Sequence, residues 1–134
     1  MQIRNKLFRK FRRAEDGAAT VEAVLWLPFF VLTFVLIADL SFVFHRQAEI
    51  QRIVQDANRL YSVGFLQSES EAETWVKDAI ATLSTSAIVD AVEDGGVIRT
   101  QVLVPVDDLV AVGGFDFLSG YRISVQTEQM IEFF

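Results

Sequence analysis

One carboxylate stands beside a long apolar segment. Glu22 directly precedes Ala23–Ala38, sixteen residues without a charged side chain. An ionised acid is costly in lipid and normally has a partner, so we expect Glu22 to pair with a positive group. The alternative is that Glu22 lies at the headgroup boundary beside Arg12 and Arg13, where those cations and water satisfy it.

Other polar residues are candidates for metal binding. His45 and Glu49 are one helical turn apart, but two ligands do not close a site. The acidic pairs Glu93-Asp94 and Asp107-Asp108 lack the ligand spacing of a calcium loop, so we expect solvated turns. The sequence also lacks a phosphate-binding glycine motif and a nucleophile motif. We therefore expect no metal, no cofactor and no enzymatic activity.

The apolar segment must position Glu22, and its length suits a membrane. Together with Ala18–Glu22 it has twenty-one residues, about 31 Å as a helix at ~1.5 Å per residue. A hydrocarbon core is about 30 Å thick, so the segment is long enough to span it. A buried helix of a soluble protein is disfavoured, because this segment is apolar on every face. Pro28 removes one backbone bond within it, and a functional kink and simple tolerance both remain open.

Charge predicts how this segment lies in a membrane. The chain has 134 residues, no cysteine and a net charge of −6, yet residues 1–13 hold six of its twelve Lys and Arg residues. Positive flanks stay in the cytoplasm, so we expect the leader inside and the bulk of the chain in the periplasm. We interpret the leader as a topology signal that contacts anionic lipid, and we expect no nucleic-acid partner. The lack of cysteine excludes disulfide scaffolds and thiolate metal sites.

The junction between the leader and the apolar run resembles a known family. Small residues lie before the run, at Gly17, Ala18 and Ala19, whereas the bulky sequence from Ala38 to Gln47 is a poor signal-peptidase site. An acidic pair and glycine (Glu15-Asp16-Gly17), small residues, Val21-Glu22, an aliphatic run and Pro28 follow one another. This order resembles the TadE-like pseudopilins of the tight-adherence (Flp-type) pilus system. The resemblance is specific over Glu15–Pro28 and extends to about Tyr61.

The resemblance implies that an inner-membrane prepilin peptidase cuts after Gly17. Ala18 would then be the first residue of the mature chain and Glu22 its fifth. It also implies a minor pilin-like role, with other pilin-like subunits and pilus assembly proteins as partners. The chemistry agrees, since Gly17 allows close backbone approach and the new α-amine of one subunit could neutralise Glu22 of its neighbour. We therefore expect Gly17, Ala18 and Glu22 to form a processing site, and Glu22 and Pro28 to act in assembly.

The helical pattern continues beyond the apolar run. Apolar residues recur at spacings of three and four from Ile50 to Tyr61, so one continuous helix is expected over about 18–62. We favour packing of this stripe against the protein's own C-terminal domain. Binding of a partner helix is the alternative.

A second helix and two strands are expected after a turn around Gly64. The helix is predicted from a Ser70 cap to about Leu83 or Val92. A break follows at Glu93-Asp94-Gly95-Gly96. Alternating apolar residues predict strands at Val97–Val106 and at Tyr121–Phe133, the latter with Tyr121, Ile123 and Val125 on its buried face.

These elements predict an α+β fold, in which a long N-terminal transmembrane helix extends outward to a small C-terminal helix-plus-β-strands domain. The expected boundaries are 1–17 for the cytoplasmic leader, 18–44 for the transmembrane helix and 45–134 for the extracytoplasmic domain. The predicted function is that of a minor pseudopilin in the assembly of a tight-adherence type IV pilus or secretion machine. An uncleaved single-pass inner-membrane anchor with a periplasmic scaffolding domain is the alternative.

Overall fold

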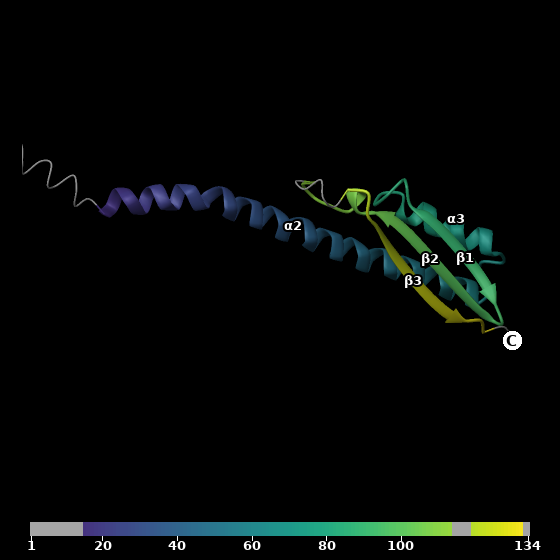
Figure 1. The fold of residues 1–134 in the computed structure, drawn as a ribbon. Coiled ribbons are helices and arrows are strands. Elements are labelled where there is room, and N and C mark those ends of the chain that lie inside the picture. The colour runs from purple at the N-terminus through teal and green to yellow at the C-terminus, as the bar shows by residue number, and fades with distance from the viewer. Residues whose placement is uncertain (1–14, 114–118, 133–134) are drawn as a thin grey trace, which may run out of the picture. The chain divides into compact units, whose positions relative to one another are not determined.

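The chain divides into two compact units, Met1–Val35 and Leu36–Phe134. The computed structural model describes residues 15–113 and 119–132 (Figure 1). Most of the expected leader, up to residue 14, lies outside the described residues. One helix, α2, runs over Glu15–Ser62 with Pro28 inside it. The expected continuous helix is therefore confirmed.

In the first unit, α2 is apolar and exposed. The side chains over Val24–Val31, Pro28 aside, are all at least half exposed. The helix is long and apolar enough to cross a membrane, and none of its most apolar window is buried within the protein. An apolar surface of this size is unfavourable in water, so the helix indicates a membrane anchor.

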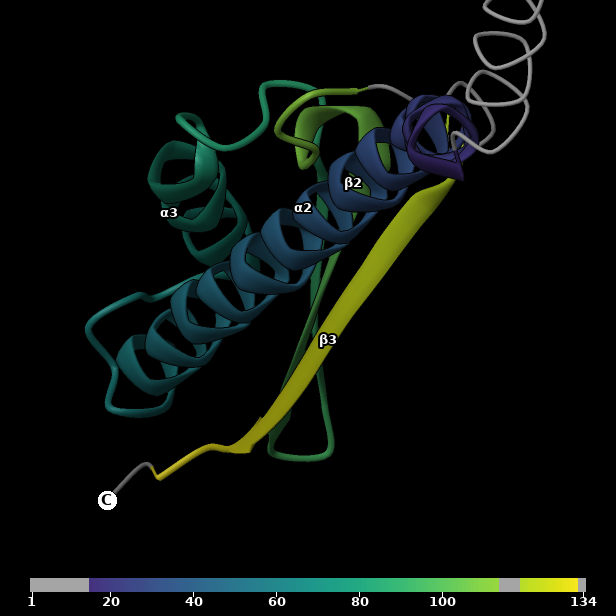
Figure 2. The same cartoon turned by 90° about the vertical axis from the view of Figure 1, so that its left-hand side faces the viewer.

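The second unit contains a three-stranded antiparallel sheet. Its strands are β1 (Ile88–Asp94), β2 (Val97–Pro105) and β3 (Arg122–Met130), in the spatial order β1-β2-β3. Helix α3 (Glu69–Ile80) precedes β1, and a 3₁₀ turn, η1 (Val106–Asp108), follows β2. The C-terminal part of α2 and α3 lie on the same side of the sheet (Figure 2). The expected α+β fold is confirmed.

The core of this unit lies between the helices and one face of the sheet. On β2 every second residue from Ile98 to Val104 is buried, as strand geometry requires. From α2, the core takes Val43, Ile50, Val54 and Ala57. The apolar stripe of α2 thus packs against the protein's own domain, which confirms the favoured interpretation.

The second helix differs from its prediction at both ends. Its N-cap is Ser68, not Ser70, and the Ser68 hydroxyl accepts a hydrogen bond from the Glu71 amide at 3.2 Å. The prediction of Ser70 was wrong because Ser68 also has an acid three residues on. Glu71 Oε2 accepts from the amide of Gln67, the residue before the cap, at 2.8 Å. The helix ends at Ile80, well before Val92.

The segment assigned to the end of that helix forms a third strand. Over Ile88–Asp94 only Val89 and Ala91 are buried, and a short run of this kind does not distinguish helix from strand by sequence. The expected break is the turn of the β1–β2 hairpin, in which Gly95 and Gly96 have φ of 60° and 82°. Tyr121 is 67% exposed, so its expected place on the buried face of the last strand was wrong. Phe133 lies outside the described residues.

Candidate processing and assembly segment

Gly17 and Ala18 lie at the start of α2. A Cβ added to Gly17 would meet no atom within 4 Å, so packing among the described residues does not require a glycine there. Glycine in a helix costs about 1 kcal/mol relative to alanine. Gly17 therefore lowers helix stability without a packing reason, and this favours a role in which another backbone approaches closely.

The carbonyl of the Gly17–Ala18 peptide bond is engaged within the helix. The Thr20 hydroxyl donates a hydrogen bond to the Gly17 carbonyl oxygen at 3.0 Å. Thr20 thus adds one side-chain-to-backbone contact next to the Gly17–Ala18 peptide bond.

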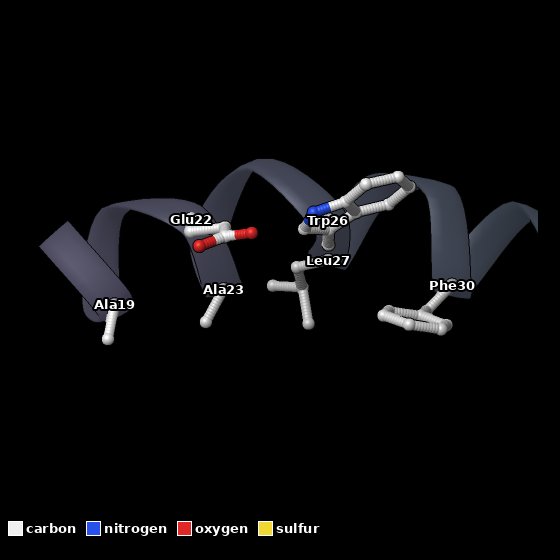
Figure 3. A pocket seen from close by; sticks show the side chains of 6 residues that line it. All are labelled: Ala19, Glu22, Ala23, Trp26, Leu27 and Phe30. Carbon is white, nitrogen blue, oxygen red and sulfur yellow. The ribbon is translucent and has the colours of Figure 1, made fainter.

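Glu22 borders a shallow apolar hollow on the surface of α2 (Figure 3). The hollow is lined by Ala19, Glu22, Ala23, Trp26, Leu27 and Phe30. These residues are three and four positions apart and so share one side of the helix. The Glu22 side chain is exposed, and its carboxylate forms no hydrogen bond or ion pair with another described residue. An apolar surface with one carboxylate at its border can seat a second helix and bind a positive group at one point.

Pro28 lies next to a cluster of aromatic rings. The Trp26 ring centroid is 5.7 Å from that of Phe29 in an edge-on arrangement, and 6.5 Å from that of Phe30. Pro28 has no amide hydrogen, so it cannot donate to the carbonyl of Val24 one turn earlier. The Thr33 hydroxyl donates to the Phe29 carbonyl at 2.8 Å, which satisfies that hydroxyl within the helix. The assembly role expected for Pro28 stays a prediction.

Two of the acidic residues considered as metal ligands have hydrogen-bond partners in the second unit. Among the described residues, no group of three His, Asp or Glu side chains could hold a metal ion. Asp108 Oδ2 accepts hydrogen bonds from the hydroxyls of Ser84 and Ser86, and these bonds lower the pKa of the Asp108 carboxyl. Glu93 accepts a hydrogen bond from the Tyr61 hydroxyl. These two acids thus have structural partners.

The sequence analysis did not predict that three polar residues of α2 bind the rest of the second unit. Asp39 is 1% exposed, and its Oδ1 accepts from the amides of Ala111 and Val112 at 3.1 and 2.8 Å. Arg46 donates to the carbonyl of Asp108 in η1, and Asn58 donates to the carbonyl of Thr127 in β3. All three continue the buried stripe of Val43, Ile50, Val54 and Tyr61 at spacings of three and four. Extending that stripe through its polar members would have found them.

The fold and this segment together indicate a membrane-anchored protein, in which one long helix carries an apolar span and its C-terminal part forms a layer of a small α+β unit. Residues 17–59 match the family model described as TadE-like protein. This region of the chain is therefore TadE-like, as its N-terminal motif predicted, and it indicates a component related to the tight-adherence pilus. That family consists of pilus-associated structural components rather than known enzymes. No curated protein and no solved structure matches the chain.

Proposed function

We propose that this protein is a minor pseudopilin that takes part in assembling a tight-adherence type IV pilus or secretion machine. The observation that carries the proposal is the TadE-like match, which begins at Gly17, the residue after which cleavage is expected. A glycine that no described residue contacts at the Cβ position, followed five residues later by an exposed acid on an apolar helix, supports it. The N-terminus would lie in the cytoplasm and the C-terminal unit in the periplasm, with the anchor in the inner membrane.

In this mechanism a prepilin peptidase cuts between Gly17 and Ala18 and removes the basic leader. The new α-amine carries a positive charge, and Glu22 carries the negative charge that binds it in a neighbouring subunit. A charge pair of this kind in a low-dielectric environment is strong when it is made and costly when it is missed, so it would set the axial register between helices. The apolar surface around Trp26 and Leu27 supplies the contact area.

Intact-mass analysis of the protein purified from its native membrane tests the cleavage. We expect a mass that lacks residues 1–17, with Ala18 as the first residue. A Gly17→Leu variant should keep its leader, because a bulky side chain blocks close approach at the cut. If wild-type protein retains residues 1–17, the uncleaved anchor with a scaffolding domain is the correct function instead.

The role of Glu22 is tested by Glu22→Gln, which removes the charge and keeps the shape. We expect this variant to insert into the membrane, but to co-purify with other pilin-like subunits at least tenfold less than wild type. A tenfold loss of affinity corresponds to about 1.4 kcal/mol of binding free energy. Glu49→Gln is the matched control, because Glu49 is also an exposed acid on α2. Normal co-purification of the Glu22 variant would contradict the register role.

A further inference from the structure

The loop after η1 is tied to α2 where the apolar run ends. Asp39, the residue that follows Ala38, binds the backbone amides of Ala111 and Val112. Two helical turns further on, Arg46 Nη1 donates to the Asp108 carbonyl oxygen at 2.8 Å. The segment 108–112 is thus held against the helix at both ends, and its position along α2 is fixed.

Apolar side chains are exposed on the same part of the second unit. Val112 is 63% exposed and Tyr121 is 67% exposed. The Tyr121 carbonyl accepts from the Val106 amide at 2.9 Å, which holds Tyr121 beside the start of η1. On α2, Leu40 and Phe44 are 40% and 66% exposed, so apolar surface continues on the helix past Asp39.

We propose that this surface, formed by Leu40, Phe44, Val112 and Tyr121, contacts the lipid headgroup–acyl boundary of the membrane that α2 enters. Leu40 is two residues beyond the uncharged run, or ~3 Å along the helix axis, so lipid is the occupant that chain continuity brings to it. Tyrosine is enriched at this boundary because its ring is apolar and its hydroxyl is polar.

The hydrogen bonds of the loop suit that position. Irregular backbone at membrane depth is tolerated only where protein satisfies its polar groups. Asp39 accepts hydrogen bonds from two amides of the loop, and Arg46 donates one to a carbonyl of the loop. The Asp39 carboxylate is at the same time shielded from lipid, since it is 1% exposed. The hydrogen bonds of Asp39 and Arg46 therefore lower two free-energy costs, that of burying the Asp39 carboxylate and that of placing the polar backbone of the loop close to lipid.

Spin labels on the full-length protein in vesicles of phosphatidylcholine and phosphatidylglycerol test the proposal. The chain has no cysteine, so Val112→Cys and the control Val92→Cys each give one labelling site. Val92 is 46% exposed on β1. We expect the ratio of collisions with oxygen, which partitions into lipid, to collisions with a water-soluble nickel chelate to be severalfold higher at residue 112 than at residue 92.

Two results would overturn the proposal. Equal ratios at the two sites would mean that the loop lies in water. A label at residue 112 that neither reagent reaches would mean that another copy of the protein covers this surface. Loss of residues 1–17 does not alter the surface, so this experiment and the test of cleavage can fail independently.

Discussion

Asn58 joins α2 to two strands through a buried amide. Its Oδ1 accepts from the Thr100 hydroxyl at 2.6 Å, and its Nδ2 donates to the Thr127 hydroxyl and carbonyl at 3.0 and 3.2 Å. Asn58 and Thr100 are almost completely buried, so a helix shifted by one residue would leave polar groups unpaired. The apolar core supplies contact area, and this amide fixes the register of the helix on the sheet.

Tyr61 lies one turn further along α2 and makes stability depend on pH. Its hydrogen bond to Glu93, together with burial, raises its pKa from 10.0 to about 12. In the unfolded chain the hydroxyl ionises near its ordinary value, whereas in the folded chain it stays protonated for longer. The stabilisation is therefore fully present below pH 10 and is lost as pH rises through the folded pKa of about 12.

We predict that Tyr61→Phe is less stable than wild type by on the order of 1 kcal/mol at neutral pH, because the bond to Glu93 is lost. The difference should shrink between about pH 10 and 12, where wild type loses its advantage. Urea unfolding of both proteins across this range measures it. A difference that stays constant to pH 12 would contradict the assigned cause.

At the scale of the elements, the β1–β2 hairpin and α3 act together. Helix α3 closes the outer edge of β1, since Glu73 Oε1 accepts from the Ala91 amide at 3.2 Å and Glu69 Oε1 from the Glu93 amide at 2.5 Å. Open strand edges invite pairing with other chains. The two glutamates of the first turns of α3 thus protect an edge that would otherwise present amides to solvent.

The hairpin turn sets the register of β1 on β2, and we predict that its two glycines differ in tolerance. Gly96→Ala should cost roughly 1–2 kcal/mol, because alanine disfavours positive φ. Gly95→Asn should change stability by no more than about 0.5 kcal/mol, since asparagine accepts φ near 60° in such turns. Thermal unfolding of the two variants and of wild type measures the loss of stability at each position. A Cβ at either position meets no atom within 4 Å, so equal losses would show that backbone conformation is not the cause.

At the scale of the whole molecule, the compact second unit runs over Leu36–Phe134, and the expected start of the extracytoplasmic domain at His45 stays a prediction. Asp39 and Val43 are 1% and 6% exposed within it. The stretch of α2 from Asp39 to Val43 was thus assigned to the transmembrane helix by its sequence, yet both of these residues are buried in the second unit. The boundary of 18–44 for the transmembrane helix stays a prediction.

Two fragments of the chain, starting at Leu36 and at His45, test where the folded second unit begins. In a mild detergent, we predict that a fragment from Leu36 is more stable than a fragment from His45 by roughly 2–4 kcal/mol, because the shorter one loses the burial of Val43 and the Asp39 bonds. Denaturant unfolding gives the difference. Val43→Ala in the longer fragment is the control and should account for part of it. Equal stability would place the boundary at His45.

Much of this protein follows from local sequence. The uncharged run predicts the apolar helix, spacings of three and four predict its continuation to Ser62, and alternation predicts the second and third strands. The motif from Glu15 to Pro28 predicts the TadE-like match. Each of these properties is set by residues close together in the chain, because hydrophobic periodicity and turn chemistry are local.

Only the tertiary structure decided what the polar residues of the stripe bind. Asp39 binds amides that are 72 and 73 residues away along the chain, and Asn58 binds partners that are 42 and 69 residues away along the chain. It also decided that Ile88–Asp94 is a strand, since that short run becomes extended by pairing with β2 and binding α3. Periodicity tells which face of an element is buried, but the group that covers it comes from a distant part of the chain. Sequence spacing does not contain that distance, and so these contacts required the folded molecule.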